Sequence, residues 1–248
     1  MQKTPVITGN LRDHMICVPE CIQACSGIRI FGKLIRSIVF TTDVAVVRNI
    51  NADAVIAVYP FTPQPSITHA IIAAAEMPVF CGVGGGITGG KRVVSLARDA
   101  EFQGAIGVVV NAPTPDETIS SLSEVIDIPV VVTVVSEHTD FDARLVAGAG
   151  ILNVSGAAKT SQIVRSIRQK YPDVPIMATG GNTDESIMET IEAGANAITY
   201  TPPSPAMLFK ELMETYRNRC QDRQEPIYNH SRADDYDEKH QNETLYFE

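Results

Sequence analysis

The feature that most constrains this chain is a repeat. A short apolar run followed by an amphipathic helical pattern recurs eight times between residues 37 and 220. The runs are rich in Val, Ile and Ala at consecutive positions, which is typical of parallel strands covered on both faces. Gly, Pro, Asp and Ser gather at the joins between runs and helical stretches. The expected strands are residues 37–42, 52–59, 78–84, 105–111, 129–136, 150–156, 175–181 and 196–202.

Evenly spaced strand–helix units predict an α/β fold, a single (β/α)8 TIM barrel. An open, doubly wound sheet is the alternative, but a count of eight strands favours closure. Residues 37–220 are the expected barrel, and residues 1–36 are expected to form a helix and hairpin extension that packs on it. Residues 221–248 form a polar tail. The polar composition of this tail is typical of disorder. An artificial origin is the other interpretation, because the tail ends in ETLYFE, which resembles a protease-recognition tag.

Composition and charge limit the classes of binding partner and the cellular compartment that we expect. The net charge is −9 and the basic residues are scattered, which argues against a nucleic-acid surface. No apolar run reaches about 18 residues, so we expect no membrane span. The N-terminal MQKTPVITGN lacks the apolar stretch of a secretory signal, and an odd count of five cysteines predicts reduced thiols. We therefore expect a cytoplasmic protein, with a homo-oligomer left open.

Two adjacent glycines mark the join between the seventh expected strand and its helix. Gly180 and Gly181 end the strand, and the helix starts about three residues later. The free N–H groups of a helix start carry partial positive charge, and without Cβ atoms an anion can approach them closely. The pattern predicts a phosphate site at Gly180, Gly181 and Asn182. The alternative is a tight turn that needs positive φ.

The stretch PIMATGGNTDESIMETIEAGANAITY, residues 175–200, resembles the phosphate-binding (β/α)8 superfamily. The stretch LVAGAGILNVSG at 145–156 is similar to the same superfamily one unit earlier. The superfamily includes epimerases, synthases and flavin-dependent enzymes that bind phosphorylated ligands. The resemblance implies a phosphate held by the loops after the seventh and eighth strands. This chain departs from the pattern after the eighth strand, where TPPSPA replaces a glycine-rich loop and leaves Ser204 as the expected contact.

Acid–base candidates follow the first and fifth expected strands. Asp43, Glu137 and His138 lie where strands end, which is where TIM barrels place catalytic groups. A partly buried carboxylate there can exchange protons with a substrate. The alternatives are a helix N-cap for Asp43, a solvated loop residue for Glu137 and a surface histidine for His138.

Other residues at the strand ends are expected to line the pocket. Among them, Cys81 is either a nucleophile activated by His138 or a buried apolar thiol. The glycine-rich loop after the third strand is either a ligand contact or a mobile connection. The expected lining residues are Thr41, Tyr59, Cys81, Gly84, Gly85, Asn111, Asn153, Thr179 and Thr201.

No metal site is expected. Cys17, Cys21 and Cys25 recur every four residues and would share one face of a helix, but no fourth ligand is evident, so a packing stripe is favoured over a zinc or cluster site. No lysine ends a strand, which removes support for Schiff-base chemistry. We predict no cofactor, with FMN as an open possibility on the phosphate loops.

These features predict an enzyme that acts on a small phosphorylated metabolite by acid–base chemistry, as an isomerase, epimerase or lyase. An FMN-dependent oxidoreductase and a non-catalytic ligand-binding barrel are the alternatives. A hydrolase has less support, because neither a metal triad nor a nucleophile elbow is present.

Overall fold

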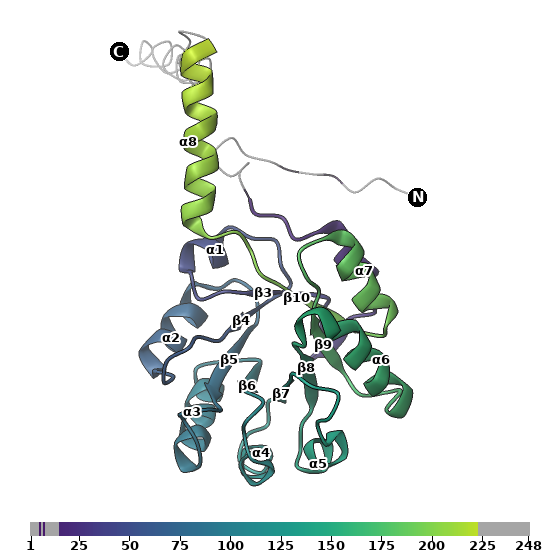
Figure 1. Ribbon diagram of the computed structural model, residues 1–248. Coiled ribbons are helices and arrows are strands. Elements are labelled where there is room, and N and C mark those ends of the chain that lie inside the picture. Colours follow the sequence, from purple (N-terminus) through teal and green to yellow (C-terminus); the bar gives the residue numbers. More distant parts are fainter. Residues whose placement is uncertain (1–4, 6, 8–14, 223–248) are drawn as a thin grey trace, which may run out of the picture. The chain divides into compact units, whose positions relative to one another are not determined.

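Eight parallel strands close into a barrel in the computed structural model, which describes residues 5, 7 and 15–222 (Figure 1). The strand order around the barrel is β10-β3-β4-β5-β6-β7-β8-β9. This closure confirms the single (β/α)8 barrel, and each strand lies within its expected range. The barrel strands are β3 (Ser37–Phe40), β4 (Ala54–Ala57), β5 (Val79–Gly84), β6 (Gly107–Val110), β7 (Val130–Val134), β8 (Ile151–Val154), β9 (Ile176–Thr179) and β10 (Ala197–Tyr200).

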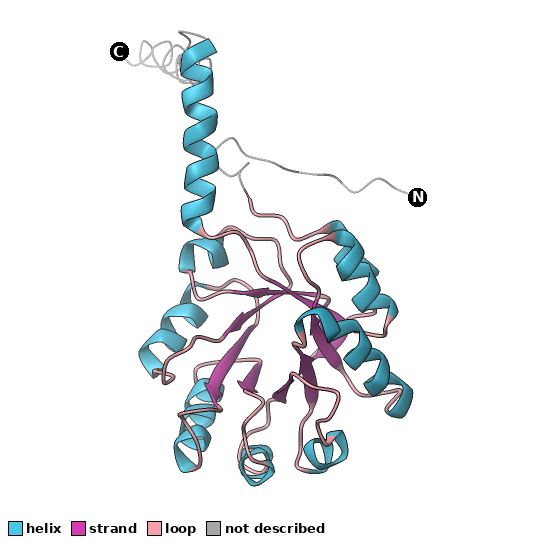
Figure 2. Cartoon of the chain, viewed as in Figure 1, coloured by secondary structure: helices cyan, strands magenta, loops and turns pink. Residues whose placement is uncertain are grey.

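Helices surround the strands (Figure 2). Several begin at side-chain caps: Asp43 accepts hydrogen bonds from two amides of α1, and Thr183 forms a capping box with Ser186 at α7. No helix in the described part of the chain is both long and apolar enough to cross a membrane. The helices that follow strands β3 to β9 are α1 (Val44–Arg48), α2 (Pro65–Ala74), α3 (Lys91–Phe102), α4 (Asp116–Ser123), α5 (Phe141–Val146), η2 (Ala157–Lys159), α6 (Thr160–Lys170) and α7 (Asp184–Glu192).

The chain divides into two compact units, Met1–Pro202 and Pro203–Glu248. The barrel belongs to the first unit. The second contains one described helix, α8 (Pro205–Asp222), whose start is capped by Ser204. The predicted tail falls almost entirely outside the described residues.

Alternate strand residues build two layers of core. Outward-facing side chains such as Val39, Val55 and Cys81 pack in the layer between strands and helices. Inward-facing ones such as Ile56 and Phe80 fill the barrel interior. This alternation follows from the two-residue period of a strand, and it explains why the runs are apolar on both faces.

A hairpin closes the amino-terminal end of the barrel. Its strands are β1 (Ile28–Ile30) and β2 (Lys33–Ile35), which pair antiparallel across a turn in which Phe31 and Gly32 have positive φ. Ile28, Ile30 and Ile35 are buried in one cluster with inward-facing residues from the starts of the barrel strands. The amino-terminal end of the barrel is therefore filled by apolar side chains.

The segment before the hairpin runs along the outside of the barrel. Ile16 forms a parallel bridge with Ile50, and η1 (Glu20–Ala24) packs beside α7. Only Cys21 lies in η1, so the three cysteines do not share one helix face: Cys17 is exposed, Cys21 is half-buried and Cys25 is buried. Within the described residues, no group of three His, Cys, Asp or Glu side chains is placed to hold a metal ion.

Candidate functional site

The carboxyl ends of the strands surround a cavity of about 280 Å³, which we call the mouth. Active sites of TIM barrels lie at this end. Strands β3 and β4 contribute apolar side chains, whereas β6 to β10 contribute mainly amides and hydroxyls. The lining residues are Phe40, Ile56, Val58, Val109, Asn111, Thr133, Asn153, Ser155, Thr179, Thr199 and Thr201.

Two polar atoms of the mouth are buried without a partner. Asn153 Oδ1 and Thr199 Oγ1 make no hydrogen bond to any described residue. Their side chains line the cavity, and the two residues are only 8% and 6% exposed. An unpaired buried polar atom costs about 1–3 kcal/mol, so native proteins usually give it a partner. A bound ligand could supply that partner to both atoms.

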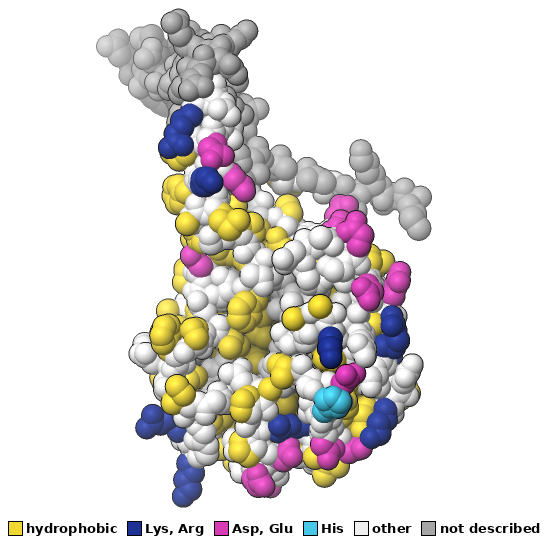
Figure 3. Space-filling view, in the orientation of Figure 1, with side chains coloured by type: hydrophobic (Ala, Val, Ile, Leu, Met, Phe, Trp, Pro, Cys, Tyr) yellow, Lys and Arg dark blue, Asp and Glu magenta, His cyan; other side chains and the backbone are white. Residues whose placement is uncertain are grey.

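The remaining polar groups of the mouth are only weakly engaged. Asn153 Nδ2 donates to Thr133 Oγ1 at 3.4 Å, and Thr179 Oγ1 donates to Ser155 Oγ at 3.4 Å. Both contacts are long for hydrogen bonds, so these groups can turn toward a ligand at little cost. Among the described residues, no charged side chain lines the mouth. Figure 3 shows hydrophobic and uncharged atoms around the hollow in the middle of this face.

The three predicted acid–base residues lie on loops beyond the strand ends and are not among the lining residues. Asp43 caps α1, where its Oδ1 accepts from Ala45 N at 2.8 Å. Glu137 accepts from Gln162 Nε2 at 3.1 Å and lies 3.9 Å from Lys159 Nζ. His138 is exposed. Their catalytic roles stay predictions.

The two glycines at the end of β9 have structural reasons to be glycine. Gly181 has φ +84°, and a Cβ there would lie 2.4 Å from Ser186 Oγ. A Cβ on Gly180 would lie 2.8 Å from side chains of Ile187 and Ile198, so its absence lets α7 pack close to the sheet. These facts agree with the tight turn, and they do not test the predicted phosphate site.

The start of α7 carries an exposed carboxylate of its own. Hydrogen bonding to the backbone amide of Glu185, and then to the Thr183 hydroxyl, lowers the pKa of the Glu185 carboxyl. A lowered carboxyl pKa is the direction that the partial positive charge of a helix start favours. Glu185 and Asn182 are exposed, so an external phosphate could displace the carboxylate. Ser204 belongs to the second unit, where its Oγ accepts from Met207 N at 3.3 Å.

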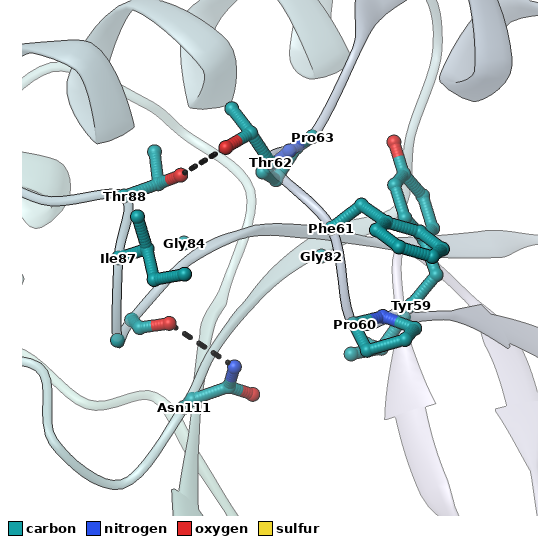
Figure 4. Close-up of a pocket in the computed structure, with 13 residues that line it drawn as sticks. Tyr59, Pro60, Phe61, Thr62, Pro63, Gly82, Gly84, Ile87, Thr88 and Asn111 are labelled. Atoms are coloured by element: carbon teal, nitrogen blue, oxygen red, sulfur yellow. Dashed lines mark hydrogen bonds between the residues drawn. The ribbon is translucent and has the colours of Figure 1, made fainter.

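The predicted lining residues divide into three groups. Asn111, Asn153, Thr179 and Thr201 line the mouth. A second cavity of about 220 Å³ adjoins it and is lined by Tyr59, Gly84, Gly85 and, again, Asn111 (Figure 4). Thr41 and Cys81 line neither cavity.

Cys81 is placed for packing rather than for attack. Its side chain is 1% exposed in the outer layer of the core, and burial raises the pKa of its thiol to about 12. A thiol of that pKa is almost entirely protonated near neutral pH and is a poor nucleophile.

Sequence reasoning did not select Thr133 or Thr199, both of which line the mouth. For Thr199 the sequence does carry a signal, because this residue lies two positions before the predicted Thr201. A strand period of two places the two residues on the same face.

No protein-family model matches the chain, and no curated protein matches it. Solved structures do. A phosphonopyruvate hydrolase in complex with oxalate and Mg²⁺ is 13% identical with a TM-score of 0.58, over 92% of this chain and 99% of that one. A 2,3-dimethylmalate lyase of the PEP mutase/isocitrate lyase superfamily is 13% identical with a TM-score of 0.54, over 81% of each chain. A mandelate oxidase mutant with an FMN adduct is 16% identical with a TM-score of 0.54, over 71% of this chain and 68% of that one. At these identities, the likeness shows the TIM-barrel fold.

The mouth does not fit a magnesium site. Mg²⁺ in proteins is held by one or two carboxylates in octahedral geometry. The described lining residues offer hydroxyls and amides but no carboxylate, and no group of three His, Cys, Asp or Glu side chains elsewhere in the described part of the chain is placed to hold a metal ion. We therefore derive no chemical step through a metal. FMN stays untested, because a shared fold says nothing of a shared flavin.

Proposed function

We propose that the protein is an enzyme that binds a small phosphorylated metabolite in the barrel mouth and acts on it by acid–base chemistry, as an isomerase, epimerase or lyase. The observation that carries the proposal is the pair of buried, unpartnered atoms, Asn153 Oδ1 and Thr199 Oγ1, at the catalytic end of the barrel. Such atoms are tolerated where a ligand completes them.

Each part of the site has a distinct role in this proposal. Asn153 Oδ1 accepts a hydrogen bond from a hydroxyl or amide of the substrate, and Thr199 Oγ1 donates or accepts one. The phosphate lies against the amides of Gly181 and Asn182, where it displaces the Glu185 carboxylate. Asp43, Glu137 or His138 moves the proton when the loops close over the substrate.

Ligand binding tests the proposal directly. The full chain is mixed with a panel of sugar phosphates and phosphorylated carboxylic acids, each beside its dephosphorylated counterpart, and the melting temperature is measured. We expect a phosphorylated member to stabilise the protein more than its counterpart, by mass action. Thr199→Val is expected to reduce the shift. Stabilisation by no member, or equal stabilisation by both members of every pair, contradicts the proposal.

Turnover separates the enzyme from its main competitor. A non-catalytic ligand-binding barrel is favoured by one observation: no ionisable side chain of the described residues lines the mouth. Phosphorus NMR of the stabilising ligand after incubation with the protein decides between them. A changed spectrum that Glu137→Gln abolishes supports the enzyme, whereas an unchanged spectrum supports the binding barrel.

A further inference from the structure

We propose that the cavity beside the mouth binds an uncharged apolar group, such as an aromatic ring, that belongs to the same ligand as the polar part held in the mouth. We call this cavity the annex. It lies between the loop after β4 and the loop after β5, and has a volume of about 220 Å³ (Figure 4). The proposal rests on the proposed function, because it extends the substrate of that site.

The annex exposes apolar side chains that gain from being covered. Phe61 is 73% exposed on the loop after β4, and Ile87 is 98% exposed on the loop after β5. Pro60 and Pro63 also line the cavity, and no Asp, Glu, Lys or Arg of the described residues does. Burial of apolar surface is favourable by about 25 cal/mol per Å², so an apolar group is the preferred occupant.

The annex and the mouth are adjacent. Val58 and Asn111 line both cavities. Asn111 is held at the junction, since its Nδ2 donates to Gly85 O at 3.3 Å and its backbone N donates to Gly84 O at 3.0 Å. Arg144 fixes the loop that follows by donating to Ala112 O at 3.0 Å. One ligand can therefore extend from the mouth into the annex beside a fixed amide.

The walls of the annex are set by specific contacts before any ligand arrives. Thr88, only 6% exposed, donates from its hydroxyl to Thr62 Oγ1 at 3.3 Å and so joins the two loops. Tyr59 is fixed by Gln64 N, which donates to its hydroxyl at 2.8 Å. Gly85 has φ +101°, and a Cβ there would lie 2.6 Å from Asn111 N. A preformed wall lowers the entropy cost of binding.

Size and polarity define the ligand class. An apolar cavity of about 150 Å³ accepts benzene in a well-studied lysozyme, so the annex is large enough for a ring or a short branched chain. The ligand would then be a two-part molecule, with hydrogen-bond donors at one end and an uncharged apolar group at the other.

A fragment pair tests this without using phosphate. The probes are 3-phenylpropane-1,2-diol and propane-1,2-diol, titrated onto the full chain by ligand-observed NMR. We expect the phenyl compound to bind about tenfold more tightly, because its ring leaves water. Phe61→Ala and Ile87→Ser are expected to remove most of that advantage while leaving the affinity for propane-1,2-diol unchanged.

The matched control is Phe102→Ala, which truncates a phenylalanine that is similarly exposed, at 78%, and lines neither cavity. It should leave both affinities unchanged. Equal affinity for the two probes, no binding of the phenyl compound, or equal losses in Phe61→Ala and Phe102→Ala overturns the proposal. The proposed function fails by a different result, the absence of phosphate-dependent stabilisation, so the two failures are distinguishable.

Discussion

The two ends of the barrel are built from the same strands but from opposite kinds of side chain. At the amino-terminal end, Ile28, Ile30 and Ile35 of the hairpin pack against inward-facing apolar residues. At the carboxyl end, Asn153 and Thr199 occupy inward-facing positions and leave polar atoms unpaired. Burial of apolar side chains stabilises the amino-terminal end, whereas the unpaired polar groups of the mouth lower stability but stay available for hydrogen bonds to a ligand.

The largest expected loss of stability follows a substitution at the amino-terminal end of the barrel. Ile35→Ala removes a side chain that is 0% exposed, and should lower the free energy of unfolding by about 3 kcal/mol through lost burial and a residual cavity. Urea denaturation measures this loss. Ligand affinity of the folded protein should not change, so a loss of affinity equal to that of a mouth variant would break the comparison.

Gly85→Ala should have the next largest effect, at the junction of the mouth and the annex. Its positive φ and the close approach of Asn111 N both oppose a Cβ, and we expect a loss of about 2 kcal/mol. Gly86→Ala is the matched control, because Gly86 has φ +91° but open space around its Cβ position. The same denaturation assay should show a smaller loss for Gly86→Ala, and equal losses would mean that the contact with Asn111 is unimportant.

Thr199→Val is expected to stabilise the ligand-free protein, which is the opposite of the effect expected for Ile35→Ala. The substitution keeps the shape and removes a buried hydroxyl that has no partner among the described residues, so the ligand-free protein should become more stable by about 1 kcal/mol. Differential scanning calorimetry without ligand measures this gain. A destabilised variant would indicate that the hydroxyl already has a partner.

Asp43 separates a structural role from a catalytic one at the rim. Asp43→Ala should lower the free energy of unfolding by about 0.7 kcal/mol, because α1 loses its cap. Asp43→Asn keeps a capping oxygen and should preserve stability while removing the ionisable group. Turnover lost in both variants assigns acid–base chemistry to Asp43, and turnover kept in Asp43→Asn leaves the cap as its role.

The smallest expected effect concerns Cys81, which lies on a strand of the mouth but faces outward. Its buried thiol has a pKa of about 12, so iodoacetamide at pH 8 should leave it unmodified while the exposed Cys17 reacts. Mass spectrometry of the folded protein distinguishes the two sites. Rapid labelling of Cys81 would place it in the ligand cavity after all.

The fold could be predicted from the sequence because its signal is repeated. Runs such as 105–111 and 129–136 are apolar on consecutive positions, which is typical of strands covered on both faces, and eight such runs leave few topologies. The hairpin was also foreseeable, since Gly32 interrupts two short apolar runs. That Ile28 and Ile30 would enter the barrel interior was not readable, because local patterns do not encode the end of the barrel that a hairpin closes.

The candidate site was less readable. Asn111, Asn153, Thr179 and Thr201 line the mouth because strand ends converge in any TIM barrel. Asp43 shows the limit of that reasoning, since a carboxylate after a strand serves equally as a helix cap. Phe61 and Ile87 gave no signal at all, because exposed apolar residues on loops acquire meaning only when two loops face each other across a cavity.

The hairpin at the amino-terminal end of the barrel has a consequence for how a ligand enters and leaves. Because the isoleucines of the hairpin fill that end, the described barrel is open only at the mouth. Whatever arrives at Asn153 and Thr199 must leave by the way it came, so departure and the next arrival compete for the same opening, and the loops around that opening set the pace of both.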